Sequence, residues 1–183
     1  MPPMRYDTAV LGGGIIGAAL AEELARRGQR VCLIERETIG SEASKAAAGI
    51  LSAKTDLDGP GPFFDFCQAA MDMYPSWVRR LERQSHRRVG YAKEGILCVT
   101  LTPQGERQME ARARWQRRMG ITVERWPARQ VRAREPHASR EIRAGYFFPD
   151  EAEIDNVALM DALAIACRRA GVSVWELTEV RKL

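Results

Sequence analysis

This chain of 183 residues has few histidines, no closely spaced cysteines and no long apolar run. The longest weakly polar run, Ala9–Ala21, ends at two glutamates after 13 residues. A helix needs roughly 20 apolar residues to cross a bilayer. Asp7 and the glycines also interrupt the apolar segment that a signal peptide requires. We therefore expect no membrane span and no secretory leader, and we expect a soluble, cytoplasmic protein.

The sequence also lacks the patterns of a metal or redox centre. The cysteines are at least 31 residues apart and form no C-x-x-C pair, so we expect buried or unreactive thiols at Cys32, Cys67, Cys98 and Cys167. His86 and His137 are isolated from other ligand types. The acidic run at residues 150–155 lacks the alternating oxygen ligands of a calcium loop. We expect no metal site.

Lysine is rare, and arginine supplies nearly all of the positive charge. Lys and Arg number 28 against 24 Asp and Glu, which gives a net charge of +4 and a pI of about 9.1. Such an excess can serve nucleic acid or anionic ligands. Here, however, acids separate the bases, and the arginine-rich residues 106–118 have the spacing of an amphipathic helix. We expect a solvated helix face and no nucleic-acid partner.

The beginning of the chain carries a strand–helix–strand pattern. Short apolar runs at Tyr6–Leu11 and Val31–Glu35 predict two buried strands. Between them, Ile15–Arg27 has helical spacing and ends at Gly28. A strand, a helix and a strand within so short a span predict one βαβ unit, with a right-handed crossover and a parallel sheet.

The remaining chain alternates helices and strands. Small side chains dominate residues 38–53, and residues 58–62 are typical of a turn. We expect Pro75 to kink a long helix and Asp155 to cap the last one. Apolar spacing predicts helices at residues 63–85, 103–119, 126–134 and 157–170. Apolar runs predict strands at residues 95–101, 145–148 and 172–175, the last leading into residues 178–183. No cap or turn follows, so we expect a truncated chain.

A glycine-rich turn between the first strand and the first helix carries the clearest functional signal. Residues 12–17 match G-x-G-x-x-G, with Glu35 closing the next strand, which is the context of a dinucleotide site. Gly12 permits the turn, Gly14 lets a pyrophosphate approach the backbone, and Gly17 lets the helix pack closely. The helix amides would then face the phosphates. Glu35 would bind an adenosine ribose and repel the 2′-phosphate of NADP.

The segment that follows Glu35 favours FAD over NAD. A simple NAD dehydrogenase normally continues into another short βα unit, but here residues 41–52 carry mostly small side chains. Such a segment could lie along a longer cofactor. Ser44 and nearby amides would contact the pyrophosphate, and Gly49 would lie close to a flat ring.

Several local motifs together resemble a known family. They are Glu35-Arg36, residues 39–44, the AAAGIL run at residues 46–51 and the FFDF run at residues 63–66. These motifs resemble the FAD-dependent amine oxidases of the D-amino acid oxidase superfamily, and within it the glycine oxidases of thiamine biosynthesis. The resemblance runs from residue 4 to the end, with later matches at residues 135–136, 145–147 and 155, and is most specific in the first 52 residues.

The resemblance implies an α/β fold in two parts. One is a Rossmann-like FAD-binding domain with a parallel sheet, at residues 1–88 and 151–183. The other is part of a mixed α+β substrate domain, at residues 89–150. Ile50 and Ser52 are implied to lie beside the flavin ring and the substrate, with contact to the flavin alone as the alternative. The implied FAD contacts are Gly12, Gly14, Ile15, Ile16, Gly17, Glu35, Arg36, Ala43, Ser44, Ala48, Gly49, Ile50 and Val180.

The implied activity is oxidation of glycine or another small primary or secondary amine to an imine, with molecular oxygen reduced to hydrogen peroxide. In this family the arginine and tyrosine that hold the substrate lie in the C-terminal half, which we expect beyond Leu183. No residue here is therefore assigned as catalytic, and the isolated fragment is expected to be inactive. Assembly into a homo-oligomer is compatible with the family.

Two alternatives remain open from the sequence. One is an FAD-dependent dehydrogenase that oxidises a D-amino acid or glycerol phosphate and passes electrons to a quinone. The other is a truncated nucleotide-binding fragment without turnover.

Overall fold

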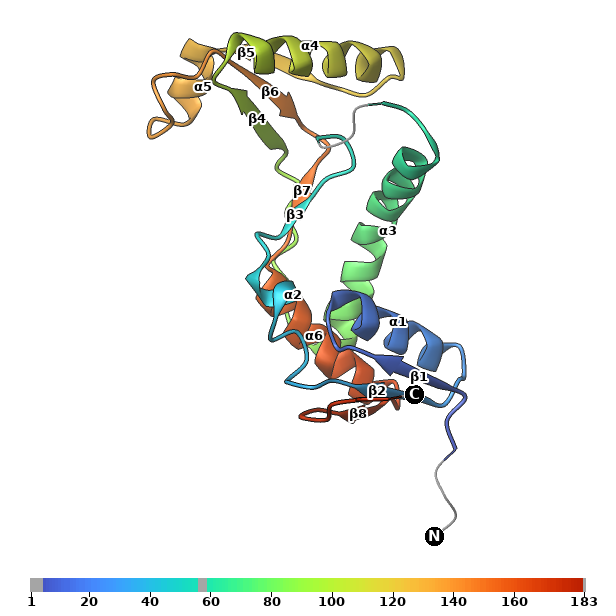
Figure 1. Cartoon of the computed structure of the whole chain (residues 1–183). Coiled ribbons are helices and arrows are strands. Elements are labelled where there is room, and N and C mark those ends of the chain that lie inside the picture. Colours follow the sequence, from blue (N-terminus) through green and yellow to red (C-terminus); the bar gives the residue numbers. More distant parts are fainter. Residues whose placement is uncertain (1–4, 56–58, 183) are drawn as a thin grey trace. The chain divides into compact units, whose positions relative to one another are not determined.

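The computed structural model describes residues 5–55 and 59–182, and it separates into two units (Figure 1). Unit 1 comprises Met1–Ile50, Tyr74–Tyr91 and Ile154–Leu183, and unit 2 comprises Leu51–Met73 and Ala92–Glu153. The turn expected at residues 58–62 and the end of the segment expected at residues 178–183 fall partly outside the described residues. Across the described residues, no helix combines the length and apolar character needed to span a membrane.

A three-stranded parallel sheet forms the centre of unit 1. Its order is β1 (Thr8–Leu11), β2 (Val31–Ile34) and β8 (Ser173–Trp175). The helices α1 (Ile15–Arg26) and α6 (Asn156–Arg169) pack against each other and against these strands. The parallel sheet with its βαβ unit is confirmed, as is the helix cap at Asp155, whose carboxylate accepts the Ala158 amide at 2.9 Å.

Small side chains let α1 and α6 approach closely. Ala18 and Ala21 of α1 and Ala166 and Cys167 of α6 are all buried. The Cys167 thiol donates to the carbonyl oxygen of Ala18 at 3.2 Å, and burial raises the pKa of this thiol to about 12. Because the thiolate is the reactive form of cysteine, Cys167 acts as a packing residue. All four cysteines are free, as the sequence indicates.

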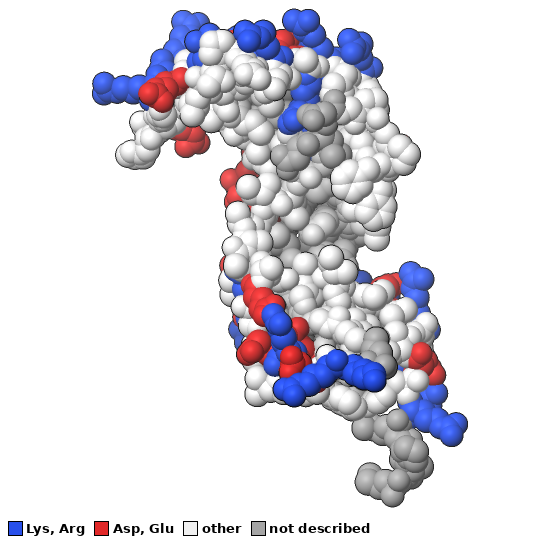
Figure 2. All heavy atoms as spheres, in the orientation of Figure 1, with Lys and Arg blue, Asp and Glu red and all other residues white. Residues whose placement is uncertain are grey.

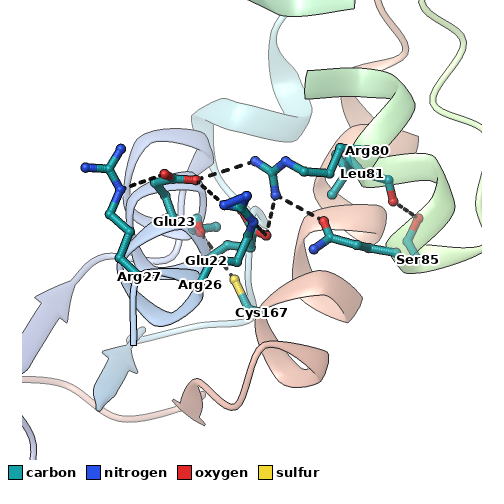
Figure 3. A network of polar contacts seen from close by, with 10 residues as sticks. Glu22, Glu23, Arg26, Arg27, Arg80, Leu81, Ser85 and Cys167 are labelled. Atoms are coloured by element: carbon teal, nitrogen blue, oxygen red, sulfur yellow. Dashed lines mark hydrogen bonds and ion pairs between the residues drawn. The ribbon is translucent and has the colours of Figure 1, made fainter. Parts of the chain in front are cut away.

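A buried acid links α1 to the second half of α3 (Pro62–Ser85), as Figure 3 shows. The Glu22 side chain is fully buried, and its Oε1 accepts Arg80 Nη1 at 2.6 Å and lies 3.7 Å from Arg26 Nε. Arg80 also donates to Gln84 at 3.1 Å and lies 3.7 Å from Glu23. A buried carboxylate is tolerated only when it is paired, so this network fixes the two helices to one another.

The long helix α3 has nearly the predicted extent, and its apolar residues are buried only in part. It begins one residue earlier than expected and continues through Pro75. Val78 and Leu81, in the half that belongs to unit 1, are buried as their spacing predicts. Three large apolar residues in the other half of the helix are instead exposed: Phe63, Phe66 and Met73.

An antiparallel sheet with a helix on each face forms most of unit 2. Its order is β4 (Ile96–Thr100), β6 (Ala144–Phe148) and β5 (Glu124–Pro127). Alternate residues of β6 point to opposite faces. Those at positions 144, 146 and 148 pack with Ala113 of α4 (Pro103–Arg118), whereas Phe147 packs with Val131 of α5 (Ala128–Arg134). The mixed α+β expectation is confirmed.

The structure corrects one prediction in unit 2. It also contains three short elements, in different parts of the chain, that the sequence did not predict. The helix predicted at residues 126–134 is present as Ala128–Arg134 with Pro127 as its N-cap, but Trp126 and Pro127 end strand β5 instead of forming its first residues. Trp126 is held in the strand because its buried ring stacks on Phe147 with centroids 4.7 Å apart. The sequence did not indicate the short elements α2 (Ala43–Ala46), β3 (Ile50–Leu51) and β7 (Ala152–Glu153), of which β3 and β7 pair.

A charged pair at the start of β1 makes unfolding sensitive to acid. Asp7 accepts hydrogen bonds from Arg30 at 2.7 Å (Nη2) and 2.8 Å (backbone amide), and these lower the pKa of Asp7 from 3.8 to about 2. The unfolded chain therefore binds more protons at Asp7, and stability falls as the pH drops from about 3.8 towards 2.

We expect Asp7→Asn to remove this part of the acid dependence. The measurement is the denaturant midpoint as a function of pH, and Arg30→Gln should flatten the curve in the same way. An unchanged slope in both variants would contradict the role of the pair.

Candidate functional site

The turn between β1 and α1 has the geometry that a dinucleotide turn requires. Gly12 has a φ of +99°, a left-handed conformation that favours glycine. A Cβ on Gly17 would lie 1.9 Å from the carbonyl oxygen of Gly12, so only glycine fits where α1 meets the turn. Gly14 is the residue before the first turn of α1, where amides that lack a partner within the helix and the positive end of the helix dipole favour an anion.

A cavity of about 530 Å³ lies along this turn. Its wall is formed by β1, the glycine turn, the first turns of α1 and one residue of α2, Ser44. The cavity brings together six of the predicted cofactor residues: Gly12, Gly14, Ile15, Ile16, Gly17 and Ser44. The Ile16 side chain is 82% exposed.

Ser44 reaches the turn from α2. Its hydroxyl oxygen accepts the Ile15 amide at 2.9 Å. The Asn156 side chain in turn donates to the Ser44 carbonyl oxygen at 2.8 Å, so α6 helps to hold α2 beside the turn. The sequence did not single out Asn156, because a contact across more than a hundred residues leaves no local pattern.

Glu35, directly after β2, is held by two backbone amides. It accepts the amide of Gly13 at 2.6 Å and that of Glu37 at 2.9 Å. Burial alone would raise the pKa of the Glu35 carboxyl, but the hydrogen bonds from Glu37 and Gly13 outweigh it and lower the pKa. The carboxylate is therefore charged and fixed beside the glycine turn, where it can still accept hydrogen bonds from a ribose.

Arg36, another predicted cofactor residue, forms an ion pair with Glu42 on the surface. The fold itself requires glycine at position 49, because a Cβ there would lie 2.0 Å from the carbonyl oxygen of Ile154. This close approach explains the glycine without a cofactor.

The cavity wall does not include the other predicted residues. Ile50 is 62% exposed and Val180 is 40% exposed, and Ser52 belongs to unit 2. The remaining predicted contacts outside the wall are Ala43 of α2 and Ala48. Within residues 5–55 and 59–182, no group of three His, Cys, Asp or Glu side chains could hold a metal ion.

A comparison with protein families gives the class of this chain. Residues 7–183 match the family described as FAD dependent oxidoreductase, so the chain belongs to that family, whose cofactor is FAD. The site fits such a cofactor, since the turn leaves no side chain between backbone and pyrophosphate and a charged acid lies beside it.

More particular relatives are glycine oxidases. That of Geobacillus kaustophilus is 31% identical over 177 residues, which are 96% of this chain and 47% of that protein. The bifunctional protein ThiO/ThiG of Synechocystis sp. is 32% identical over a region that covers 97% of this chain and 26% of that protein. The crystal structure of the Geobacillus glycine oxidase matches with a TM-score of 0.92 at 29% identity, over 97% of this chain and 48% of that one. The chain thus spans about half the length of the glycine oxidases it matches.

Proposed function

We propose that this chain is the FAD-binding portion of an enzyme that oxidises glycine or another small primary or secondary amine to an imine. The observation that carries the proposal is the glycine turn with Glu35 fixed beside it, in a chain similar to glycine oxidases over nearly its whole length. Bound FAD would accept a hydride from the amine, and molecular oxygen would then be reduced to hydrogen peroxide.

The residues of the chain supply binding and orientation. The amides at the start of α1 and the Ser44 hydroxyl surround the pyrophosphate position, where the helix dipole favours negative charge. Glu35 holds the adenosine ribose, and its charge disfavours a 2′-phosphate. We further propose contacts of the cofactor with Arg36, Ala43, Ala48, Gly49, Ile50 and Val180.

We propose that residues 1–88 and 151–183 form the FAD-binding domain and that residues 89–150 begin the substrate domain. Units 1 and 2 follow this division apart from a few residues at the boundaries and residues 51–73, which belong to unit 2. Ile50 and Ser52 would lie near the substrate, and the groups that clamp it would come from outside this chain. The enzyme would work in the cytoplasm without a nucleic-acid partner, which is consistent with its four free cysteines.

The test uses the purified full-length protein. We expect a yellow protein that consumes oxygen and releases peroxide with glycine or sarcosine. Reduction of a dye without oxygen consumption would instead support the quinone-linked dehydrogenase. A well-folded, colourless protein that takes up no FAD would overturn the proposal.

Glu35→Gln tests the ribose contact separately. Hydrogen bonds to charged groups contribute about 1.5–3 kcal/mol, so we expect roughly ten- to hundredfold weaker FAD binding by flavin fluorescence titration. Glu37→Gln is the matched control, because Glu37 offers only its backbone amide to Glu35. Equal affinity of the two variants would contradict the assigned role of Glu35.

A further inference from the structure

The excess positive charge of the chain is concentrated in one part of unit 2. Residues 103–143 contain eleven arginines, five glutamates and no lysine or aspartate, whereas the whole chain has a net charge of only +4. Figure 2 shows basic side chains gathered over α4, with few acidic ones among them. The rest of the sequence is therefore slightly acidic, and this segment differs from it in electrostatic character.

A cavity of about 710 Å³ opens among these arginines, within the usual size of small-molecule sites. We call it the arginine cavity. Residues of α4, β5 and β6 and one residue just before β6 form its wall. The charged and hydroxyl side chains of the wall are Glu106, Arg107, Glu110, Arg114, Arg125, Arg143 and Tyr146.

Glu106 and Tyr146 order the inner part of the arginine cavity. The Glu106 carboxylate accepts Arg125 Nη2 at 2.7 Å and Arg143 Nε at 3.1 Å. The hydrogen bond from Arg125 is the main reason why the pKa of Glu106 is lowered, so the acid stays charged. Tyr146 is buried, and its hydroxyl donates to Glu110 at 3.2 Å. The two guanidinium groups are therefore held in fixed positions, with further N–H donors left over.

The carboxylates do not neutralise the wall. Four wall arginines face two wall glutamates, and Glu110 also lies 3.6 Å from Arg117, outside the wall. Among the described residues Arg107 has no ion-pair partner, and the only partner of Arg114 is Glu110, 3.5 Å away. At least two positive charges remain uncompensated in one concave site, where their mutual repulsion favours an anion.

We propose that the arginine cavity binds a small molecule that carries phosphate with at least two negative charges. Its arginines approach from α4, from β5 and from the segment before β6, so their N–H groups converge from several directions. The guanidinium fork matches both carboxylate and phosphate, but the oxygens of a tetrahedral phosphate point in several directions and can accept from several guanidinium groups at once, whereas the two oxygens of a carboxylate lie in one plane. The site is independent of the flavin chemistry proposed above, because all of its residues lie in unit 2.

The test is calorimetric titration of the full-length protein with inorganic pyrophosphate. The protein is first saturated with FAD and unbound FAD is removed by gel filtration, so that the glycine turn does not compete for the probe and no free FAD competes at the arginine cavity. We expect saturable binding that Arg107→Gln/Arg114→Gln weakens roughly tenfold or more, because charge-assisted hydrogen bonds are lost. Both side chains are at the surface, and circular dichroism and thermal melting check that the variant folds.

Arg129→Gln/Arg132→Gln is the matched control, since it removes the same charge from exposed positions on α5 outside the cavity wall. We expect this control variant to bind pyrophosphate with an affinity within about threefold of the wild type, because an exposed charge contributes little interaction energy. Equal weakening by both double variants would mean nonspecific attraction and would overturn the site. Absence of binding at millimolar pyrophosphate would also overturn it. Citrate that binds as tightly as pyrophosphate would overturn the assignment to phosphate.

Discussion

Gly17→Ala should weaken FAD binding by roughly five- to a hundredfold. A Cβ at this position would lie 1.9 Å from the carbonyl oxygen of Gly12, a distance that no relaxed structure tolerates. Either the glycine turn or the start of α1 must move, and overpacking of this kind costs about 1–3 kcal/mol. The movement would displace the amides that we propose to contact the pyrophosphate. The flavin retained on purification and the Kd for FAD measure the effect.

Gly61→Ala is the control for this substitution. This substitution also adds one methyl group to a glycine, but a Cβ on Gly61 would meet no atom within 4 Å. We expect wild-type flavin content there. Denaturant unfolding of both variants separates a local defect of the turn from general instability. If Gly17→Ala retained FAD and full stability, the close contact between α1 and the turn would be refuted.

Glu151→Leu should lower the free energy of unfolding by about 3–5 kcal/mol, the usual cost of breaking a buried ion pair. Glu151 is fully buried in unit 2, and its Oε1 lies 3.5 Å from the ammonium of Lys54, which is 7% exposed. Its Oε2 accepts the Ala53 amide at 3.0 Å. Removal of the carboxylate leaves the Ala53 amide without its acceptor and leaves the buried Lys54 ammonium with only the more distant Asp150, at 3.9 Å. Chemical denaturation followed by circular dichroism measures the loss.

The double variant Lys54→Met/Glu151→Leu distinguishes a broken pair from lost packing. Because both charges are gone, we expect it to recover most of the stability that Glu151→Leu loses. Lys93→Met is the control for an exposed pair, as Lys93 lies 3.3 Å from Asp150 at the surface, and it should change stability by about 1 kcal/mol or less. A double variant as unstable as Glu151→Leu would show that the pair itself contributes little.

Most of the helices and strands could be predicted because their signals are local. The spacing of apolar residues identified α1, α4 and α6, and the carboxylate of Asp155 marked the start of α6. Strand β5 was missed because its residues owe their conformation to pairing with β6 and to the stack of Trp126 on Phe147. The exposed Phe63 and Phe66 show the same limit, since helical spacing indicates a face but not what covers it.

The candidate site was predictable to the extent that it is contiguous. The glycine turn and Glu35 lie within one βαβ unit, whose geometry follows from chirality and chain length. The long-range supports were not predictable. The hydrogen bond from Asn156 to Ser44, and the carbonyl of Ile154 that requires a glycine at position 49, join segments more than a hundred residues apart.

The division of unit 1 into three chain segments has a consequence for the order of synthesis. Strand β2 gains its second neighbour only when β8 has been made, and the buried contact from Cys167 to Ala18 spans 149 positions. Unit 2 needs nothing after Glu153. On the ribosome, the antiparallel sheet of unit 2 can therefore close while the parallel sheet of unit 1 still lacks a strand. Strand pairing across so long a sequence separation is slow. The free edge of β2 in the nascent βαβ segment therefore stays exposed until β8 pairs with it.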